Sequence, residues 1–209
     1  MMNHVLIILL TSILLYSCAP VFSELQSART VGKNKIEFTP SLSSVHFSKN
    51  VDSEGVQNHI GIQTAYGITQ KLDIRARYER FWLKEGDRQH GLSVVGMGPK
   101  VSLVANKIAL FIPIGRSFSE DILDTWGIHP TLLFTLPALR DKIDVTLSPK
   151  YLWTFCDDCD DYISVNLGVS LSRDLNKWAI RPEYGLLFNP GESGYFGQFS
   201  LGFSTVFSK

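Results

Sequence analysis

After residue 16, the sequence lacks any apolar run that could cross a membrane as an α-helix. The longest such run, IALFIPI at residues 108–114, falls far short of the roughly 20 residues that a membrane helix needs. If this chain spans a bilayer, it must therefore do so with β-strands, which satisfy their backbone hydrogen bonds when they close into a barrel.

Net charge and catalytic motifs are also missing. Lys plus Arg number 20 and Asp plus Glu number 20, so the formal charge is zero and no basic field is available to bind nucleic acid. The sequence contains no Gly-x-Ser-x-Gly, Walker, His-Glu-x-x-His or dinucleotide-binding motif. These absences predict a protein that is not an enzyme, uses no cofactor or metal, and has no nucleic-acid partner.

Cysteine is scarce, with three residues in the chain. Cys156 and Cys159 form a Cys-x-x-Cys within FCDDCDD at residues 155–161. In an exported protein, the default for such a pair is a disulfide that closes a small loop. The alternative is a divalent cation held by both thiolates and the neighbouring aspartates, although structural zinc would need a nearby His or further Cys. We predict the disulfide.

The N-terminus has the pattern of an export signal. Its apolar run from Val5 to Tyr16 has the length of a signal-peptide core and is too short for a membrane span. We therefore predict a signal peptide at residues 1–17, and a mature protein outside the cytoplasm.

The end of this run, LYSC at residues 15–18, resembles a bacterial lipobox, although Tyr16 is bulky for its place. This pattern predicts lipidation of Cys18, whose acyl chains would contribute about 0.8 kcal/mol per buried CH₂. The alternative is a cysteine that only neighbours an ordinary cleavage site. The polar residues that follow are interpreted as a periplasmic N-terminal lead-in at 18–33.

The stretch ISVNLGVSLS at residues 163–172 alternates without interruption between apolar residues and small uncharged ones. This period of two is that of a β-strand with one apolar face. Similar stretches recur from Lys35 onward and predict about ten antiparallel strands. The candidate strands cover residues 35–47, 59–68, 71–81, 91–105, 107–116, 126–136, 141–155, 162–172, 177–188 and 195–207. Prolines within these strands predict local bulges at positions 40, 99, 130, 149 and 182.

The links between the candidate strands alternate between short and long. Short links follow residues 68, 105, 136 and 172, whereas the links at 48–58, 83–90, 116–125, 156–161 and 189–194 are longer and more polar. Outer-membrane barrels show this asymmetry, with short periplasmic turns and longer outer loops. An even number of strands would place both chain termini at the periplasmic end, where the exported N-terminus should be.

Charged residues inside the strands stay on the face opposite the apolar one. A small barrel is filled by its side chains, so matched charges could neutralise one another in a lumen; the alternative is the solvated face of a soluble sheet. The predicted lumen charge network consists of Glu37, Asp73, Arg75, Arg77, Glu79, Lys100, His129, Asp144, Lys150, Arg181 and Glu183.

Aromatic residues lie at the ends of the apolar stripes. Tyr195 and Phe207 bracket the last candidate strand, and Trp178 and Phe188 bracket the one before it. Amphipathic rings are favoured at the boundary between lipid and water. This placement favours a barrel whose apolar face contacts lipid.

Three stretches resemble small outer-membrane β-barrel proteins. YGITQKLDIRARYE at 66–79 resembles a tight hairpin of such barrels, and FGQFSLGFSTVFSK at 196–209 is similar to their aromatic-ended last strand. ELQSARTVGKNKIEFTPSLS at 24–43 resembles the start of small exported barrels from Bacteroidota-type bacteria. The resemblance covers residues 24–209 and implies the fold and an outer-membrane location, with little chemistry.

Together these patterns predict an all-β protein with a single antiparallel up-and-down transmembrane β-barrel of about ten strands over residues 34–208. We expect it to contact outer-membrane lipid and to have a structural or surface-binding role, or to form a narrow pore for very small solutes. One alternative is a soluble periplasmic β-barrel that binds an apolar ligand. Another is a hydrolase at the outer rim, where His46, His59 and His90 would lie. No protein partner is indicated.

The membrane assignment predicts that the mature protein stays in the membrane fraction during alkaline carbonate extraction and needs detergent for release. The folded barrel should also migrate differently on a gel before and after boiling. Appearance of the protein in the carbonate supernatant would instead indicate the soluble periplasmic barrel.

Overall fold

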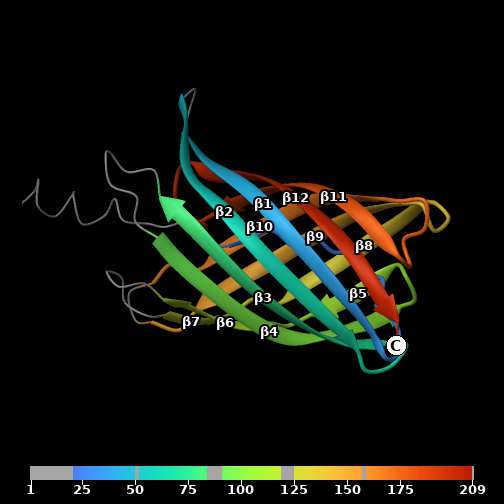
Figure 1. Cartoon of the computed structure of the whole chain (residues 1–209). Helices are drawn as coiled ribbons and strands as arrows, with labels where there is room; N and C mark the ends of the chain where they lie inside the picture. The colour runs from blue at the N-terminus through green and yellow to red at the C-terminus, as the bar shows by residue number, and fades with distance from the viewer. Residues whose placement is uncertain (1–20, 50–51, 84–90, 119–124, 157–158, 209) are drawn as a thin grey trace, which may run out of the picture.

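The computed structural model describes residues 21–49, 52–83, 91–118, 125–156 and 159–208. In these residues the chain forms a closed antiparallel barrel of ten strands (Figure 1). The predicted all-β barrel is therefore confirmed. The described residues contain no helix that is long and apolar enough to cross a membrane.

Twelve strand segments form the wall. They are β1 (Lys35–Lys49), β2 (Asp52–Gly67), β3 (Leu72–Leu83), β4 (Gly91–Val104), β5 (Ile108–Phe111), β6 (Ile114–Phe118), β7 (Thr125–Ile128), β8 (Thr131–Leu139), β9 (Ile143–Thr154), β10 (Tyr162–Leu171), β11 (Trp178–Phe188) and β12 (Tyr195–Ser208). β5 and β6 are two parts of one barrel strand, as are β7 and β8, because both members of each pair lie between the same neighbours.

The barrel closes where the last strand returns to the first. β12 pairs with β1 from Lys35 opposite Ser208 to Ser48 opposite Tyr195. Closure removes the free strand edges that an open sheet would present to lipid.

The two faces of the wall are inverted relative to a soluble protein. In β1, Glu37 and Thr39 are buried while Phe38 and Leu42 are exposed. Leu167 in the middle of β10 is 54% exposed although it is apolar. Large apolar side chains recur on the outer face of all ten strands, and a surface of this kind is stable only against lipid. The protein is thus an outer-membrane barrel, and the soluble alternative disagrees with the structure.

The two ends of the barrel differ, as the link lengths predict. At one end, called here the turn end, tight turns join β2 to β3, β4 to β5, β8 to β9 and β10 to β11, beside the start of β1 and the end of β12 (Figure 1). Asn106 and Asp141 adopt left-handed φ angles of 59° and 56° in two of these turns, a conformation that Asn and Asp tolerate. The opposite end, called the loop end, carries the longer connections and a protruding β1–β2 hairpin.

The bulges predicted at prolines 40, 99, 130, 149 and 182 are not found, and that prediction is wrong. The β1–β12 ladder, for example, skips Thr39 and Pro40 and then continues in the same register. Register shifts of the described strands occur instead at Val45/His46, Ser102/Val104 and Pro137/Leu139. Proline lacks an N–H and so omits a ladder bond, but this omission does not require an extra residue in the strand.

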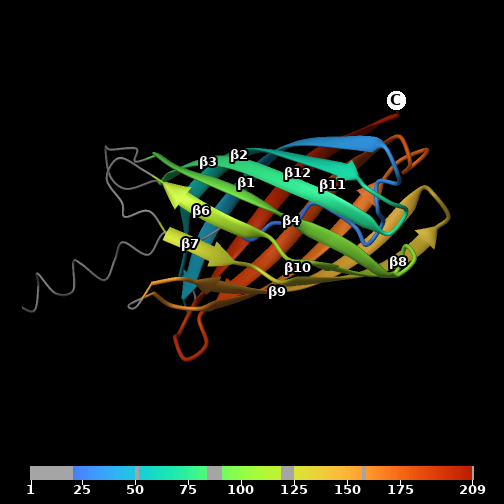
Figure 2. The same cartoon turned by 90° about the horizontal axis from the view of Figure 1, so that it is seen from below.

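Two prolines separate strand segments without opening the wall. Pro113 lies between β5 and β6, and Pro130 lies between β7 and β8; β6 and β7 run side by side at the loop end (Figure 2). Neighbouring strands remain joined here because proline still has a carbonyl acceptor. The carbonyl oxygens of prolines 99, 113 and 130 accept hydrogen bonds from the N–H groups of Ile112, His129 and Tyr151 at 3.0–3.1 Å.

The inverted surface generates a depth-dependent prediction. Leu167→Arg, in the middle of β10, should lower the free energy of unfolding by about 2–4 kcal/mol, because it places a charge near the centre of the bilayer. Phe207→Arg, at the turn end of β12, is the matched control and should cost about 0–1 kcal/mol. Both values come from urea unfolding of the protein refolded into phospholipid vesicles. Equal costs at the two positions would contradict a lipid-facing β10.

Candidate functional site

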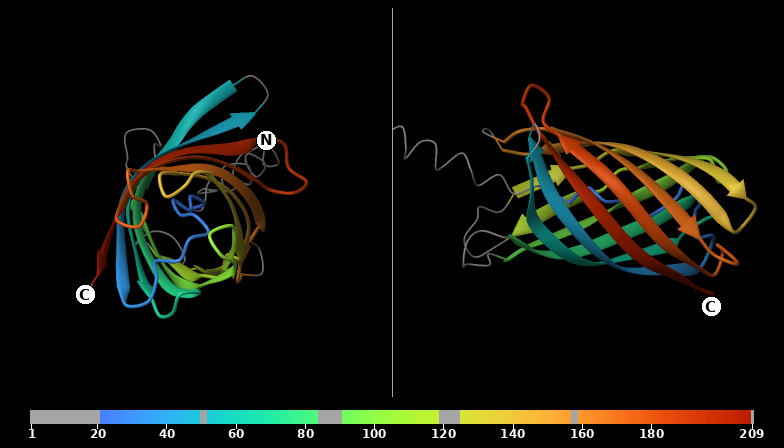
Figure 3. Two further views of the ribbon diagram at one scale, coloured as in Figure 1. Left: turned by 90° about the vertical axis from the view of Figure 1, so that its right-hand side faces the viewer. Right: turned by 90° about the horizontal axis from the view of Figure 1, so that it is seen from above.

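The lumen contains the N-terminal part of the described chain. Residues 21–31, called the plug, lie inside the ring of strands (Figure 3, blue). Residues 21–28 are all buried, and Phe22 and Ala28 are fully enclosed. The predicted periplasmic lead-in at 18–33 is therefore wrong for this stretch. Its polar sequence does not mark a solvated linker, because its main-chain groups bind the charges of the wall.

The plug runs from the loop end to the turn end. Near the loop end, Phe22 packs in a cluster with Val45, Leu152 and Leu187. Near the turn end, the N–H of Val31 donates to the carboxylate of Asp73 at the start of β3. The described chain thus begins near the loop end, although the even strand number predicted its beginning at the periplasmic end. It reaches β1 at the turn end, after a turn in which Gly32 has a φ of 91°.

Two apolar clusters line the loop end of the lumen, beside the buried polar residues His59 and Glu79, and the sequence analysis missed these clusters. A second cluster there joins Val21 to Phe81 and Leu92. A signal was present in the strands: Val45, Leu152 and Leu187 continue the inward-facing register of Ser43, Lys150 and Glu183, each ending a polar row with a large apolar residue. Apolar residues at these inward positions need an apolar partner inside the barrel, and Phe22 is that partner. Burial of a side chain of this size stabilises the folded state by about 1.5–3 kcal/mol.

Positively charged side chains of the wall bind carbonyl oxygens of the plug. Lys150 and the amide of Asn166 share the carbonyl of Phe22, at 3.1 and 2.8 Å. The remaining contacts run from Arg77 to Ser23 (2.6 Å), from Arg181 to Leu25 (2.8 Å), and from Lys100 to Ser27 and Arg29. Hydrogen bonds with an ionised partner are about twice as strong as neutral ones.

Wall acceptors bind the N–H groups of the plug in the same way. The two carboxylate oxygens of Glu183 accept from the N–H groups of Glu24 (2.7 Å) and Leu25 (2.9 Å). Two successive N–H groups thus point at one carboxylate, in the manner of backbone nests that bind anions, and Leu25 itself takes a left-handed φ of 50°. Further along, the hydroxyl of Thr135 accepts from the N–H of Ala28 at 2.8 Å.

Two side chains of the plug form ion pairs with the wall. Glu24 pairs with Lys150. Arg29 pairs with Asp144 through two of its nitrogens and with Asp141 at 2.9 Å. Asp144 and Lys150 are almost inaccessible to solvent, and breaking a buried pair by removing one member leaves an uncompensated charge.

The wall charges also pair with one another. Glu37 bridges Arg75 at 2.6 Å and Arg181 at 2.8 Å. Lys100 lies 3.6 Å from Asp73. The structure encloses all eleven residues of the predicted lumen network, with Arg77 and His129 only partly buried. The network also includes members that the sequence analysis did not assign to it, which are Glu24, Arg29, His59 and Asp141.

The histidines predicted at the outer rim do not gather there. His59 is buried in the lumen, where its Nδ1 lies 3.4 Å from Glu79 and its ring packs at a tilt against that of Phe81. His46 lies on the outer face beside Tyr184, so the wall separates it from His59. His90 lies outside the described residues. Among the residues that are described, no three His, Cys, Asp or Glu side chains form a group that could hold a metal ion.

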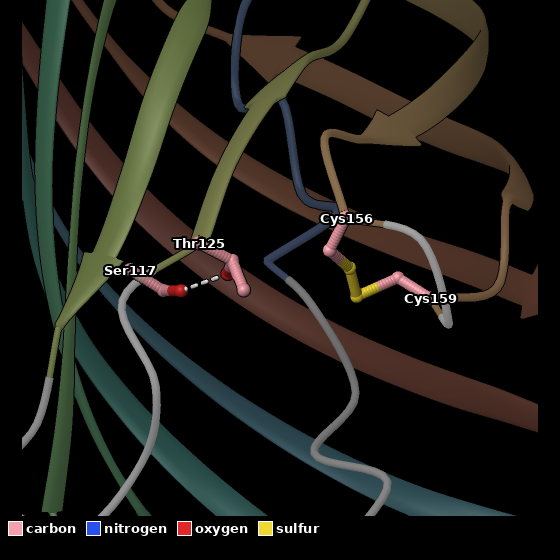
Figure 4. Close-up of a disulfide and its surroundings, with 4 residues drawn as sticks. All are labelled: Ser117, Thr125, Cys156 and Cys159. Atoms are coloured by element: carbon pink, nitrogen blue, oxygen red, sulfur yellow. Dashed lines mark hydrogen bonds between the residues drawn. A yellow bond between two sulfur atoms is a disulfide. The ribbon is translucent and has the colours of Figure 1, made fainter.

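Cys156 and Cys159 are joined by a disulfide just after β9 (Figure 4). Their Cα atoms are 5.4 Å apart. The bridge lies at the loop end, near the hydrogen bond between the hydroxyls of Ser117 and Thr125 that joins β6 to β7. Cys18, where lipidation is predicted, lies outside the described residues, as does the predicted signal peptide.

Solved outer-membrane barrels resemble this fold. An outer-membrane channel from Pseudomonas putida F1 matches with 10% identity over 89% of this chain and 100% of its own, at a TM-score of 0.49. The CymD monoaromatic hydrocarbon channel matches with 7% identity over 85% and 90% of the two chains, at 0.47. The attachment invasion locus protein Ail of Yersinia pestis matches with 9% identity over 84% and 99%, at 0.43. No protein-family model and no curated protein matches the sequence.

The contact between Glu183 and the plug predicts a measurable stability difference. Glu183→Gln keeps the side-chain size but presents an NH₂ group to one of the two plug N–H donors. We expect the free energy of unfolding to fall by about 2 kcal/mol, the scale of a hydrogen bond to a charged group. Urea unfolding in vesicles measures it, with the exposed loop variant Glu192→Gln as the control that stays unchanged. Identical stability of Glu183→Gln and wild type would show that Glu183 does not hold the plug.

Proposed function

We propose that this protein is a non-enzymatic outer-membrane barrel with a structural or surface-binding role, and that its lumen is shut at rest by the plug. The observation that carries the proposal is the path of residues 21–31 along the lumen, with main-chain contacts from Phe22 to Val31. Because the plug fills the lumen of the ten-stranded barrel, no additional gate in the loops is needed to stop solutes from passing through.

Free diffusion of solutes is opposed by the number and strength of these contacts. A solute must displace hydrogen bonds from Lys100, Arg181 and Glu183, each worth about 1.5–3 kcal/mol when one partner is charged. Passage of very small solutes through the barrel therefore requires the plug to move.

The loop end supports a role at the cell surface. The β1–β2 hairpin protrudes there (Figure 1), and β2 begins at Asp52 whereas its pairing with β3 begins only at Gln57. The disulfide after β9 constrains another connection at the same end. In barrels of this architecture, the longer loops face the outside of the cell.

The absence of an enzymatic role remains part of the proposal, as do the signal peptide at 1–17 and the lipid anchor at Cys18. The lumen residues that could serve as acids or bases, such as Glu183 and Lys150, already bind the plug. The export signal and the anchor are supported by the sequence pattern of the first 18 residues.

Single-channel recording in planar bilayers tests the closed state. We expect the wild-type protein to show no steady conductance. The double variant Phe22→Ala with Arg29→Ala should open in steps, because it removes the apolar contact at the loop end and the ion pairs at the turn end. Glu192→Gln serves as the control and should stay closed. A steady open current from the wild-type barrel would contradict a plugged lumen.

A further inference from the structure

The wall contacts the plug mainly through its main chain. Carbonyl or N–H groups of residues 22–25, 27–29 and 31 bond to wall side chains. Among plug side chains, those of Glu24 and Arg29 make the ion pairs, and Val21, Phe22 and Leu25 are buried apolar groups. Every residue except proline offers the same main-chain donor and acceptor, so most of this recognition does not depend on sequence.

From these contacts, we infer that the lumen is a binding site for a non-helical polypeptide main chain, which the plug occupies as a built-in ligand. A separate peptide of similar length can take its place. This inference extends beyond a closed barrel, since it assigns the lumen a class of ligand.

The order of wall groups along the lumen matches a polypeptide. Cations and anions alternate along the path of the plug: Lys150 and Arg77 bind carbonyls near the loop end, Glu183 binds the next two N–H groups, and Arg181 binds the carbonyl that follows. The same order recurs near the turn end, where Lys100 binds two carbonyls of the plug and Asp73 binds the N–H of Val31. A peptide backbone presents carbonyl and N–H groups in such an alternating order, whereas a small ion or sugar would engage only one or two of these wall groups.

The burial of these wall groups argues for a ligand of matching chemistry. With the plug in place, Lys100 and Asp73 are fully enclosed, and Glu183, Lys150 and Arg181 are less than a tenth exposed. A buried charge without partners is costly. The plug satisfies groups of both signs at once, and it does so without carrying a large charge of its own.

Blocking of the open lumen by synthetic peptides tests the inference. The barrel is prepared without residues 21–31 and, in parallel, as full-length chain with a protease site inserted between Lys33 and Asn34, which is cut after folding. The second form keeps the test possible if the shortened chain does not fold, since exchange of the cut plug for a fluorescent peptide can be followed on native gels. Three peptides of the plug length are compared.

The first peptide has the native sequence of residues 21–31. The second keeps the buried apolar and charged side chains, which are Val21, Phe22, Glu24, Leu25 and Arg29, and has alanine elsewhere. The third has the native side chains but is N-methylated at positions 24, 25, 28 and 31, whose N–H groups bond to the wall.

We expect the first two peptides to block the current, or to exchange for the cut plug, with affinities within about threefold of each other. The N-methylated peptide should bind at least about tenfold more weakly, since a tenfold loss corresponds to about 1.4 kcal/mol, less than one hydrogen bond to a charged group. Strong binding of the N-methylated peptide, or weak binding of the alanine peptide, would overturn main-chain recognition. Absence of binding by all three would overturn the site itself, while leaving the closed state of the wild-type barrel to its own conductance test.

Discussion

The stability of the barrel depends on the ion pairs and hydrogen bonds that compensate the charged side chains buried inside it. Lys100, Asp73 and Glu183 lie in a lumen that the wall and the plug together close to bulk water. Burial of an ionised group costs several kcal/mol unless an opposite charge or hydrogen bonds compensate for it. Cross-wall pairs such as Glu37 with Arg75 supply part of this compensation, and the main chain of the plug supplies the rest.

Plug and wall match along the length of the barrel. The apolar residues Val21 and Phe22 lie at the loop end, where they join apolar clusters of the wall, and Arg29 lies at the turn end, where it pairs with Asp141 and Asp144. Moving the plug by a few residues along the lumen would place Phe22 among charges and Arg29 away from its carboxylates. The two ends therefore set the position of the plug, while the main-chain contacts between them add affinity.

The sequence predicted the fold well because strand patterns are local. Alternation in 163–172 identifies both faces of β10, and the alternating link lengths distinguish the two ends of the barrel. The candidate site was predicted only in part. Its wall charges were recognised by their place opposite the apolar face, but residues 21–31 have no periodicity that marks an occupant of the lumen, and His59 was expected at the rim although it faces inward beside Glu79.

The sequence by itself determined the strand number and which face of each strand meets lipid, since a period of two depends only on neighbouring residues. The tertiary structure decided which groups meet inside. Glu183 binds the N–H of Glu24 across 159 positions of the chain, and Arg181 binds the carbonyl of Leu25 across 156. Contacts between residues so distant arise only when the barrel closes around the plug, so no local pattern could specify them.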